Sequence, residues 1–291
     1  MGWLTRKPGR GVVACTLALL MSGCSLTGVD EVPEWDDMDG PELTAPSETF
    51  GDLIELPEPA GEIPAAVYGF RDQTGQFREA PQSNFSTAVT QGGASLLTSA
   101  LLDSGWFQPL EREGLQDLLT ERRIARQLRE DIPGLRDARV MFEGGIVGYE
   151  SNVTTGGAGA RYFGLGASEE YRIDQVTVNL RAVDINTGEI LVSVDTTKTI
   201  YSEKLDGDLF RFVRQQRLLE AEGGYSRNEP RYLAVRDALS AALIHLIVEG
   251  VDQNHWRLAD SDATDAPVME AYRDRRQQRM ESAEGLRNDG S

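Results

Sequence analysis

The segment from Glu150 to Ile173, ESNVTTGGAGARYFGLGASEEYRI, decides between two kinds of architecture for the whole chain. It is too rich in glycine for a stable helix, because each interior glycine costs about 1 kcal/mol relative to alanine. It is also sparsely charged, since Arg161 is the one charge between Val153 and Leu165. Its length suits two strands of about 10 residues joined by a short turn, the reach of a transmembrane β-hairpin. A flexible glycine-rich surface loop is the alternative on composition alone.

Aromatic residues stand at both ends of this expected hairpin. Tyr162 and Phe163 lie near its tip, and Tyr149 and Tyr171 lie near its base. Outer-membrane barrels carry girdles of aromatic side chains at the two membrane interfaces. The positions of these four residues fit a hairpin over residues 150–173 that crosses a membrane, but the choice between this hairpin and a surface loop depends on the rest of the chain.

A second segment, residues 196–221, has a similar length. Asp206 and Gly207 provide a turn signal in its middle, and Phe210 and Phe212 follow. The length again suits two membrane-crossing strands, although this segment contains more charges than the first. A soluble β-ribbon is the alternative that those charges leave open.

The N-terminus has the signature of an exported lipoprotein. Three basic residues precede an apolar run of 12 residues, 11–22, which is too short to span a bilayer and typical of a signal peptide. The run ends in small residues before Cys24, as in a bacterial lipobox. We therefore expect a signal peptide over residues 1–23 and a covalent lipid on Cys24, with a chance cysteine as the alternative. Ser25, in place of an aspartate, is typical of lipoproteins sorted to the outer membrane.

The charge balance excludes one class of partner. The full chain has a formal net charge of −18, and the part after residue 23 has 26 basic and 47 acidic residues, a charge of −21. So acidic a protein repels nucleic acid and offers no polybasic patch to a membrane. Cys15 leaves with the signal peptide and Cys24 carries lipid, so we expect no disulfide in the mature chain.

The remaining segments define the expected domain organisation. Residues 24–60 are rich in Pro, Glu and Asp and are expected to form an extended tether. Residues 61–149 and 174–195 combine strand and helix patterns, which predicts an α/β or α+β body. Residues 222–258 add a long helix to that body. The charged tail, 259–291, leaves helix and disorder open.

Local periodicity predicts individual elements within the body. Apolar residues at helical spacing predict a helix over residues 87–103, weakened by a Gly-Gly pair. A strongly amphipathic pattern predicts another helix over residues 113–131. Alternating patterns over residues 176–182 and 190–194, separated by turn residues 186–188, predict a hairpin.

No pattern for catalysis, metal binding or cofactor binding stands out. His245 lies in the apolar helical run ALIHLIV, where a core histidine is more common than a ligand. The glycines of GGAGARYFGLG lack both the spacing of a dinucleotide site and a following helix. We therefore expect neither an enzyme nor a bound cofactor, apart from the covalent lipid on Cys24.

Several short runs make the chain similar to one known family. The most specific are DQTGQF (72–77), SNFSTAV (83–89), GYESNV (148–153), GARYFG (159–164) and NTGEIL (186–191). Together with the lipobox they resemble the CsgG family, outer-membrane lipoprotein channels that export curli amyloid subunits. The resemblance implies a periplasmic α/β domain, like a nucleotide-binding fold without a nucleotide site, with two transmembrane β-hairpins per subunit. Nine such subunits would share one barrel of 36 strands, the largest strand count known for such barrels.

The resemblance also implies a pore constriction. Asn84 and Phe85 match the family's constriction loop, in which rings of asparagine and aromatic side chains narrow the channel. Ala80 stands where the family has a tyrosine that forms a further ring. The family's aperture therefore does not carry over directly to this chain.

The function implied by the resemblance is passive export of unfolded curlin-like chains across the outer membrane. The implied partners are the other subunits of a nonamer, a periplasmic accessory that plugs the vestibule, and a surface-exposed nucleation accessory. A second hypothesis is a monomeric outer-membrane lipoprotein of the same fold that acts as an adaptor of an envelope enzyme. In that case residues 150–173 and 196–221 would be surface ribbons and not lipid-facing strands.

Overall fold

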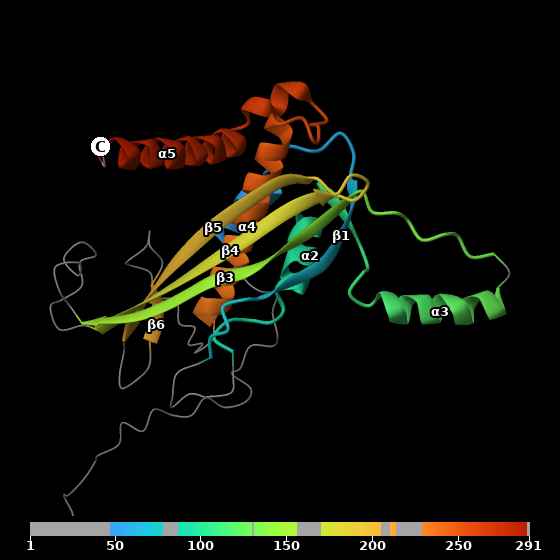
Figure 1. Ribbon diagram of the computed structural model, residues 1–291, viewed down its shortest axis with the longest axis horizontal. Helices are drawn as coiled ribbons and strands as arrows, with labels where there is room; N and C mark the ends of the chain where they lie inside the picture. The colour runs from blue at the N-terminus through green and yellow to red at the C-terminus, as the bar shows by residue number, and fades with distance from the viewer. Residues whose placement is uncertain are drawn as a thin grey trace, which may run out of the picture. The chain divides into compact units, whose positions relative to one another are not determined.

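A mixed β-sheet organises the part of the chain that the computed structural model describes, residues 47–77, 87–129, 131–155, 170–204, 210–213 and 229–289. Its six described strands follow the order β2-β1-β3-β4-β5-β6 (Figure 1). They are β1 (Ile63–Asp72), β2 (Phe107–Leu110), β3 (Val140–Thr155), β4 (Glu170–Asp184), β5 (Ile190–Lys204) and β6 (Phe210–Val213). β1 pairs in parallel with β2 and β3, and the later pairs are antiparallel. The expected body of mixed α/β character is therefore confirmed.

The described helices pack on this sheet to different extents. They are α1 (Glu48–Ile54), α2 (Gly93–Asp103), α3 (Leu115–Leu128), α4 (Glu229–Asp252), the 3-10 helix η3 (Ser261–Asp265) and α5 (Pro267–Asp289). α4 packs along β4 and β5, and α2 packs against β1 and β2. α1 and α5 both contact α4. None of these described helices combines the length and the apolar composition needed to cross a bilayer.

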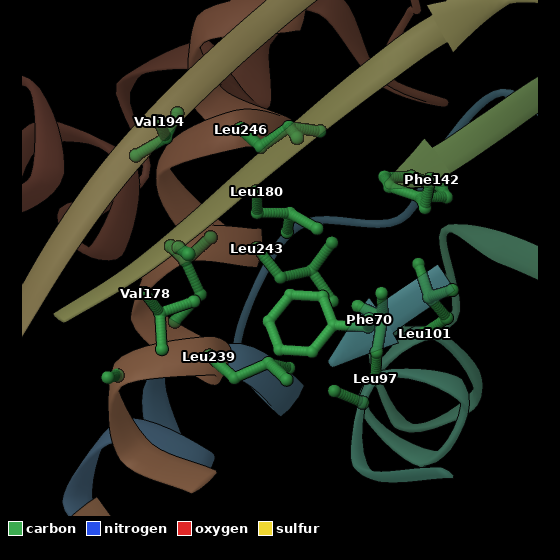
Figure 2. Packing of buried hydrophobic residues seen from close by; sticks show 14 of the residues in the cluster. Phe70, Leu97, Leu101, Phe142, Val178, Leu180, Val194, Leu239, Leu243 and Leu246 are labelled. Atoms are coloured by element: carbon green, nitrogen blue, oxygen red, sulfur yellow. The ribbon is translucent and has the colours of Figure 1, made fainter. Parts of the chain in front are cut away.

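The core lies between α4, α2 and one face of the sheet. Every second residue in the middle of β4 is fully buried: Val176, Val178, Leu180 and Ala182. This is the alternation expected of a strand with one buried face. Leu239 and Leu243 of α4 cover β4, and Phe70 of β1 lies between Leu243 and Leu97 of α2 (Figure 2). The two helices and the sheet therefore share one apolar core.

A tight turn joins β4 to β5 where the sequence predicts one. Asp184 closes it, because its Oδ1 accepts hydrogen bonds from the backbone N–H groups of Thr187 (3.1 Å) and Asn186 (2.7 Å). These bonds, that from Thr187 above all, lower the pKa of the Asp184 carboxyl by favouring its ionised form. Gly188 follows with φ of +75°, a conformation that glycine adopts without strain. The predicted hairpin is confirmed, and both of its strands are longer than predicted.

The expectation of an extended tether over residues 24–60 is wrong for its last part. α1 forms there, with Ser47 capping its start by accepting a backbone hydrogen bond. Leu53 is fully buried and Leu56 nearly so, and both belong to the core. Two leucines three residues apart give this acidic stretch an apolar side that packs near α4. Residues 24–46 lie outside the described ranges.

The helix predicted over residues 87–103 begins later, at Gly93. Thr87 instead pairs with Phe77 in an isolated β-bridge, and the next two residues turn into the core. Gly92 is the N-cap residue of α2. The Gly-Gly pair that weakens the helical pattern is therefore the point at which the helix starts.

α3 is more exposed than its sequence suggests, and α5 is more closely packed on the body than its charged sequence suggests. α3 forms as predicted, but none of its residues is buried, and Ile124 on its apolar side is 45% exposed. In the tail, the helical alternative holds over α5, where Met269 and Tyr272 are buried. The Tyr272 hydroxyl donates to Asp52 Oδ2 over 3.1 Å, which ties the tail to α1.

Candidate functional site

The strand ends that flank the two predicted hairpins lie at one end of the sheet. β3 ends at Thr155 and β4 begins at Glu170, its partner in the antiparallel register. β5 ends at Lys204, which is paired with Phe210 at the start of β6. Because β4 and β5 also run antiparallel, both strand pairs leave the sheet in the same direction (Figure 1). These four residues define what we call the hairpin end of the sheet.

β1 points toward the hairpin end as well, because it runs parallel to β3. The chain leaves β1 after Asp72, its last residue. It returns at Thr87, which bridges to Phe77. Residues 78–86 between them, which contain the predicted constriction, lie outside the described ranges. The predicted constriction segment and both predicted hairpins therefore follow strand ends that point in the same direction, although β1 ends beside Ile146, well before β3 ends at Thr155.

A buried polar cluster lies on the strands near the hairpin end. The Tyr149 hydroxyl of β3 donates a hydrogen bond to Asp174 Oδ1 of β4 over 2.8 Å. Asp174 is fully buried and Tyr149 is 4% exposed. Arg231, in the first turn of α4, places its guanidinium carbon 5.4 Å from the centre of the Tyr149 ring, a cation–π contact. Because a buried carboxylate is costly without donors, the cluster favours one arrangement of β3, β4 and α4.

The environment of this cluster keeps the tyrosine protonated. Burial raises the pKa of Tyr149 to about 12, and the negative charge of Asp174 acts in the same direction. The positive charge of Arg231 opposes this rise with a smaller effect. The phenol therefore remains a hydrogen-bond donor to Asp174 at neutral pH.

α4 is also attached to β5. Lys198 Nζ lies 3.1 Å from Asp237 Oδ2, and the Thr196 hydroxyl donates to the Ala238 carbonyl over 2.6 Å. α4 follows the second predicted hairpin along the chain. It therefore holds strands from both predicted hairpins through polar contacts as well as through the core.

The described ranges contain part of the predicted site. Tyr149, predicted as an aromatic residue at a membrane interface, lies on β3 with its side chain buried in the body, where it contacts Asp174. The backbone places Tyr171 on β4, and Phe210 and Phe212 on β6. The other predicted residues lie outside the described ranges: Cys24, Ala80, Asn84, Phe85, Tyr162 and Phe163.

Asp174 and Arg231 were not predicted from the sequence as site residues. A signal for Asp174 exists, because it has the same strand parity as Val176 and Val178 and so falls on the buried face of β4. An aspartate at such a position indicates a buried polar partner. Arg231 has no comparable signal, since its contact with Tyr149 depends on how α4 packs.

The described part of the chain gives no support for a metal site. No group of three or more His, Cys, Asp or Glu side chains in it is arranged to hold an ion. His245 packs against Tyr272 with ring centroids 4.6 Å apart. Burial lowers the pKa of His245 to about 4, and the positive charges of Arg275, Arg276 and Arg279 act in the same direction. The imidazole is therefore neutral at pH 7, as a histidine packed at the edge of a core should be.

Comparison with known proteins identifies the family. The family model described as curli production assembly/transport component CsgG matches residues 47–276. The chain belongs to the CsgG family. A CsgG from Citrobacter koseri with the same description is 45% identical over 267 residues, covering 88% of this chain and 96% of that protein. A CsgG from Escherichia coli is 44% identical over 265 residues, covering 88% and 94%.

The family match includes every element that builds the hairpin end, since residues 47–276 contain all the described strands and α4. Among solved structures, the PelC dodecamer from Paraburkholderia phytofirmans is 12% identical to this CsgG-family chain. Its TM-score is 0.28, and the likeness covers 64% of this chain and 86% of that chain. A likeness this weak carries no argument, so the sequence relatives alone define the family.

Proposed function

We propose that the chain is one subunit of an oligomeric outer-membrane channel that exports unfolded curli subunits. Membership in a family described as a curli production assembly/transport component supports a role in curli transport. The observation that carries the channel architecture is the common direction of the two strand pairs at the hairpin end. Four strands that leave one sheet side by side are suited to form a segment of a barrel wall.

A barrel shared between subunits follows from backbone chemistry. A segment of four strands has two unpaired edges, and each unsatisfied backbone group in lipid costs several kcal/mol. Neighbouring subunits satisfy these groups when their edges pair, so that a closed ring of subunits leaves no edge exposed. Nine subunits, the number that the family resemblance implies, would supply 36 strands.

The proposed transport is passive, because the periplasm offers no ATP. A ring of Asn84 amides would offer hydrogen bonds to a passing backbone, and a ring of Phe85 side chains would contact its apolar residues. Neither ring selects one sequence, which suits an extended polypeptide. The covalent lipid on Cys24 would hold each subunit at the outer membrane, and a periplasmic plug and a surface nucleation accessory would complete the machinery.

Replacing Phe85 by alanine should raise the conductance of purified channels in planar bilayers, because it removes one aromatic side chain from every subunit at the constriction. Ala80→Tyr should lower the conductance by adding an aromatic ring to the same segment. Tyr68→Ala is the matched control, since Tyr68 lies on β1 and is already 53% exposed. The control channel should conduct like the unaltered one.

Three other results would contradict parts of this proposal. If Phe85 belongs to a core, its truncation costs about 3–5 kcal/mol and the ring fails to assemble. Assembled rings with unchanged conductance for both Phe85→Ala and Ala80→Tyr would show that this segment does not line the pore. A chain that remains monomeric in the membrane would favour the adaptor hypothesis.

A further inference from the structure

The carboxylate of Asp72 closes the turn that follows β1. Asp72 Oδ1 accepts hydrogen bonds from the backbone N–H of Thr74 (2.9 Å) and from the Thr74 hydroxyl (2.6 Å). One oxygen of the carboxylate therefore fixes the direction in which the chain leaves the sheet.

The second oxygen of the same carboxylate reaches the returning chain. Gln91 Nε2 donates to Asp72 Oδ2 over 3.1 Å, and Gln91 lies two residues before the start of α2. The backbone joins the two sides again farther out, where Ala88 N–H donates to the Gln76 carbonyl over 2.8 Å. Asp72 is thus a cross-link between the outgoing chain (residues 73–77) and the incoming chain (residues 87–92), which we call the two stems.

Each stem is anchored to the body on its own. In the outgoing stem, Gln73 N–H donates to the Ile146 carbonyl of β3 over 2.9 Å. In the incoming stem, Ala88 and Val89 are each 3% exposed and belong to the core. A bond between two anchored stems does little to hold the fold together. Its effect falls on the spacing and the angle between them, together with the backbone bond from Ala88 to Gln76 and the Phe77–Thr87 bridge.

We propose that Asp72 is a positioning residue of the channel, which sets the reach of the constriction segment by fixing the two stems that carry it. This inference rests on the proposed function, because it concerns the aperture of the same pore. The stems are described residues and the segment connects directly to both of them. Rotational symmetry repeats the cross-link in every subunit, so a change at Asp72 or Gln91 acts on the whole circumference at once.

The pair allows a test by exchange of partners. Gln91→Glu places a second carboxylate against Asp72 and removes the donor. Asp72→Asn keeps a hydrogen bond, because the Gln91 amide can turn its oxygen toward the new Nδ2 donor. In the double variant D72N/Q91E, the asparagine amide donates to the glutamate, and the cross-link is restored with the opposite distribution of charge.

The measurements are single-channel conductance and open-channel current noise in planar bilayers, with ring assembly followed on gels. Loss of one exposed hydrogen bond should shift the equilibrium between the observed and altered arrangements of the stems by roughly fivefold toward the altered ones. Gln91→Glu should therefore widen the distribution of conductance and increase the noise. Asp72→Asn and the double variant should both behave like the unaltered channel. In about 1 M salt the effect of Gln91→Glu should largely persist, because screening removes the like-charge repulsion but does not restore the lost donor.

Asn186→Glu is the matched control. Asn186 follows Asp184 in the turn at the opposite end of the sheet, where the Asp184 carboxylate also accepts backbone hydrogen bonds. The control adds the same charge per subunit beside an equivalent aspartate, but away from the stems. Its conductance and noise should match those of the unaltered channel.

The outcomes separate this inference from the proposed function. If Phe85→Ala changes the conductance and Gln91→Glu does not, the channel stands and the role of Asp72 is refuted. Gln91→Glu could change the conductance or the noise while D72N/Q91E fails to restore the values of the unaltered channel. The added charge and not the cross-link would then be responsible, which also overturns the inference. Should Gln91→Glu fail to assemble, Gln91→Met removes the donor without adding a charge, and unaltered noise in that variant refutes the inference. An unaltered chain that forms no conducting ring contradicts the proposed function itself.

Discussion

Replacing Tyr149 by phenylalanine should lower the free energy of unfolding by about 1.5–3 kcal/mol, because it removes a hydrogen-bond donor from a buried carboxylate. Asp174 is fully buried, so water cannot readily replace the lost phenol. Unfolding of the chain expressed from residue 25 onward can be followed through the fluorescence of the buried Trp106 and Trp256. Tyr68→Phe is the control, since an exposed tyrosine should change stability by no more than about 0.5 kcal/mol.

A second substitution tests whether the hydroxyl acts through the carboxylate. Loss of a hydrogen-bond donor costs less free energy for a buried, neutral asparagine at position 174 than for a buried, charged aspartate. The loss caused by Tyr149→Phe should therefore be smaller in an Asp174→Asn background, which gives a coupling energy in a double-mutant cycle. Equal losses in both backgrounds would contradict the account of Tyr149 as the donor to Asp174.

The contact between Tyr149 and Asp174 should also affect how the free energy of unfolding changes at alkaline pH. The pKa of Tyr149 is raised to about 12 in the folded chain, whereas an unfolded tyrosine ionises near pH 10. Between these values the unfolded state loses its proton first, so the free energy of unfolding falls as the pH rises from about 10 to about 12. Tyr149→Phe removes this contribution, and its stability should decline less steeply over that range. If the free energy of unfolding of Tyr149→Phe fell with pH as steeply as that of the unaltered chain, other groups would be responsible for the loss of stability at alkaline pH.

The sequence predicted best those elements whose pattern depends on local geometry. The alternation around Val178 and the turn before Gly188 follow directly from strand pleat and glycine conformation, and both are confirmed. The amphipathic pattern of α3 predicted a helix correctly. It did not predict burial, because periodicity defines an apolar side and not what covers that side.

Average composition did not indicate that α1 and α5 pack on the body, because each depends on a few apolar contacts. α1 lies in an acidic, proline-containing stretch, and its place in the fold depends on Leu53 and Leu56. α5 is strongly charged, yet Met269 and Tyr272 are buried and Arg273 pairs with Asp252 at the end of α4 over 2.8 Å. Average composition cannot show such contacts, because one or two residues carry them.

The candidate site could likewise be predicted only in part from the sequence. Family resemblance indicated the hairpins and the constriction segment, since both have recognisable runs of sequence. The polar contacts around them join residues that are distant in sequence, such as Tyr149 with Asp174 and Asp72 with Gln91. Asp174 has a local signal in its strand parity, but which residue contacts it, and the pairing of Asp72 with Gln91, become apparent only when the structure is known.

In the proposed channel, that register also predicts which face of the first hairpin would meet lipid. Asn152 pairs with Ile173, and Val153 pairs with Arg172. If the alternation continued past Thr155 and Glu170, Ala158 would share a face with Ile173, and Ser168 would share a face with Arg172 and Asp174. Both positions lie outside the described ranges. The first face is mainly apolar in sequence and the second carries the arginines, so we expect the first to face lipid and the second to face the lumen.

Ala158→Arg should therefore abolish ring assembly. An arginine on the lipid face near the middle of the bilayer costs about 2–4 kcal/mol, and symmetry repeats that cost in every subunit of the ring. Ser168→Arg adds the same side chain to the lumen face, where water is present, so rings should form and their ion selectivity should shift toward anions. Detergent-resistant rings on gels and in electron micrographs measure assembly, and reversal potentials in planar bilayers measure selectivity. Equal tolerance of arginine at both positions would mean that this segment does not lie in a membrane, because a surface ribbon has no face from which charge is excluded.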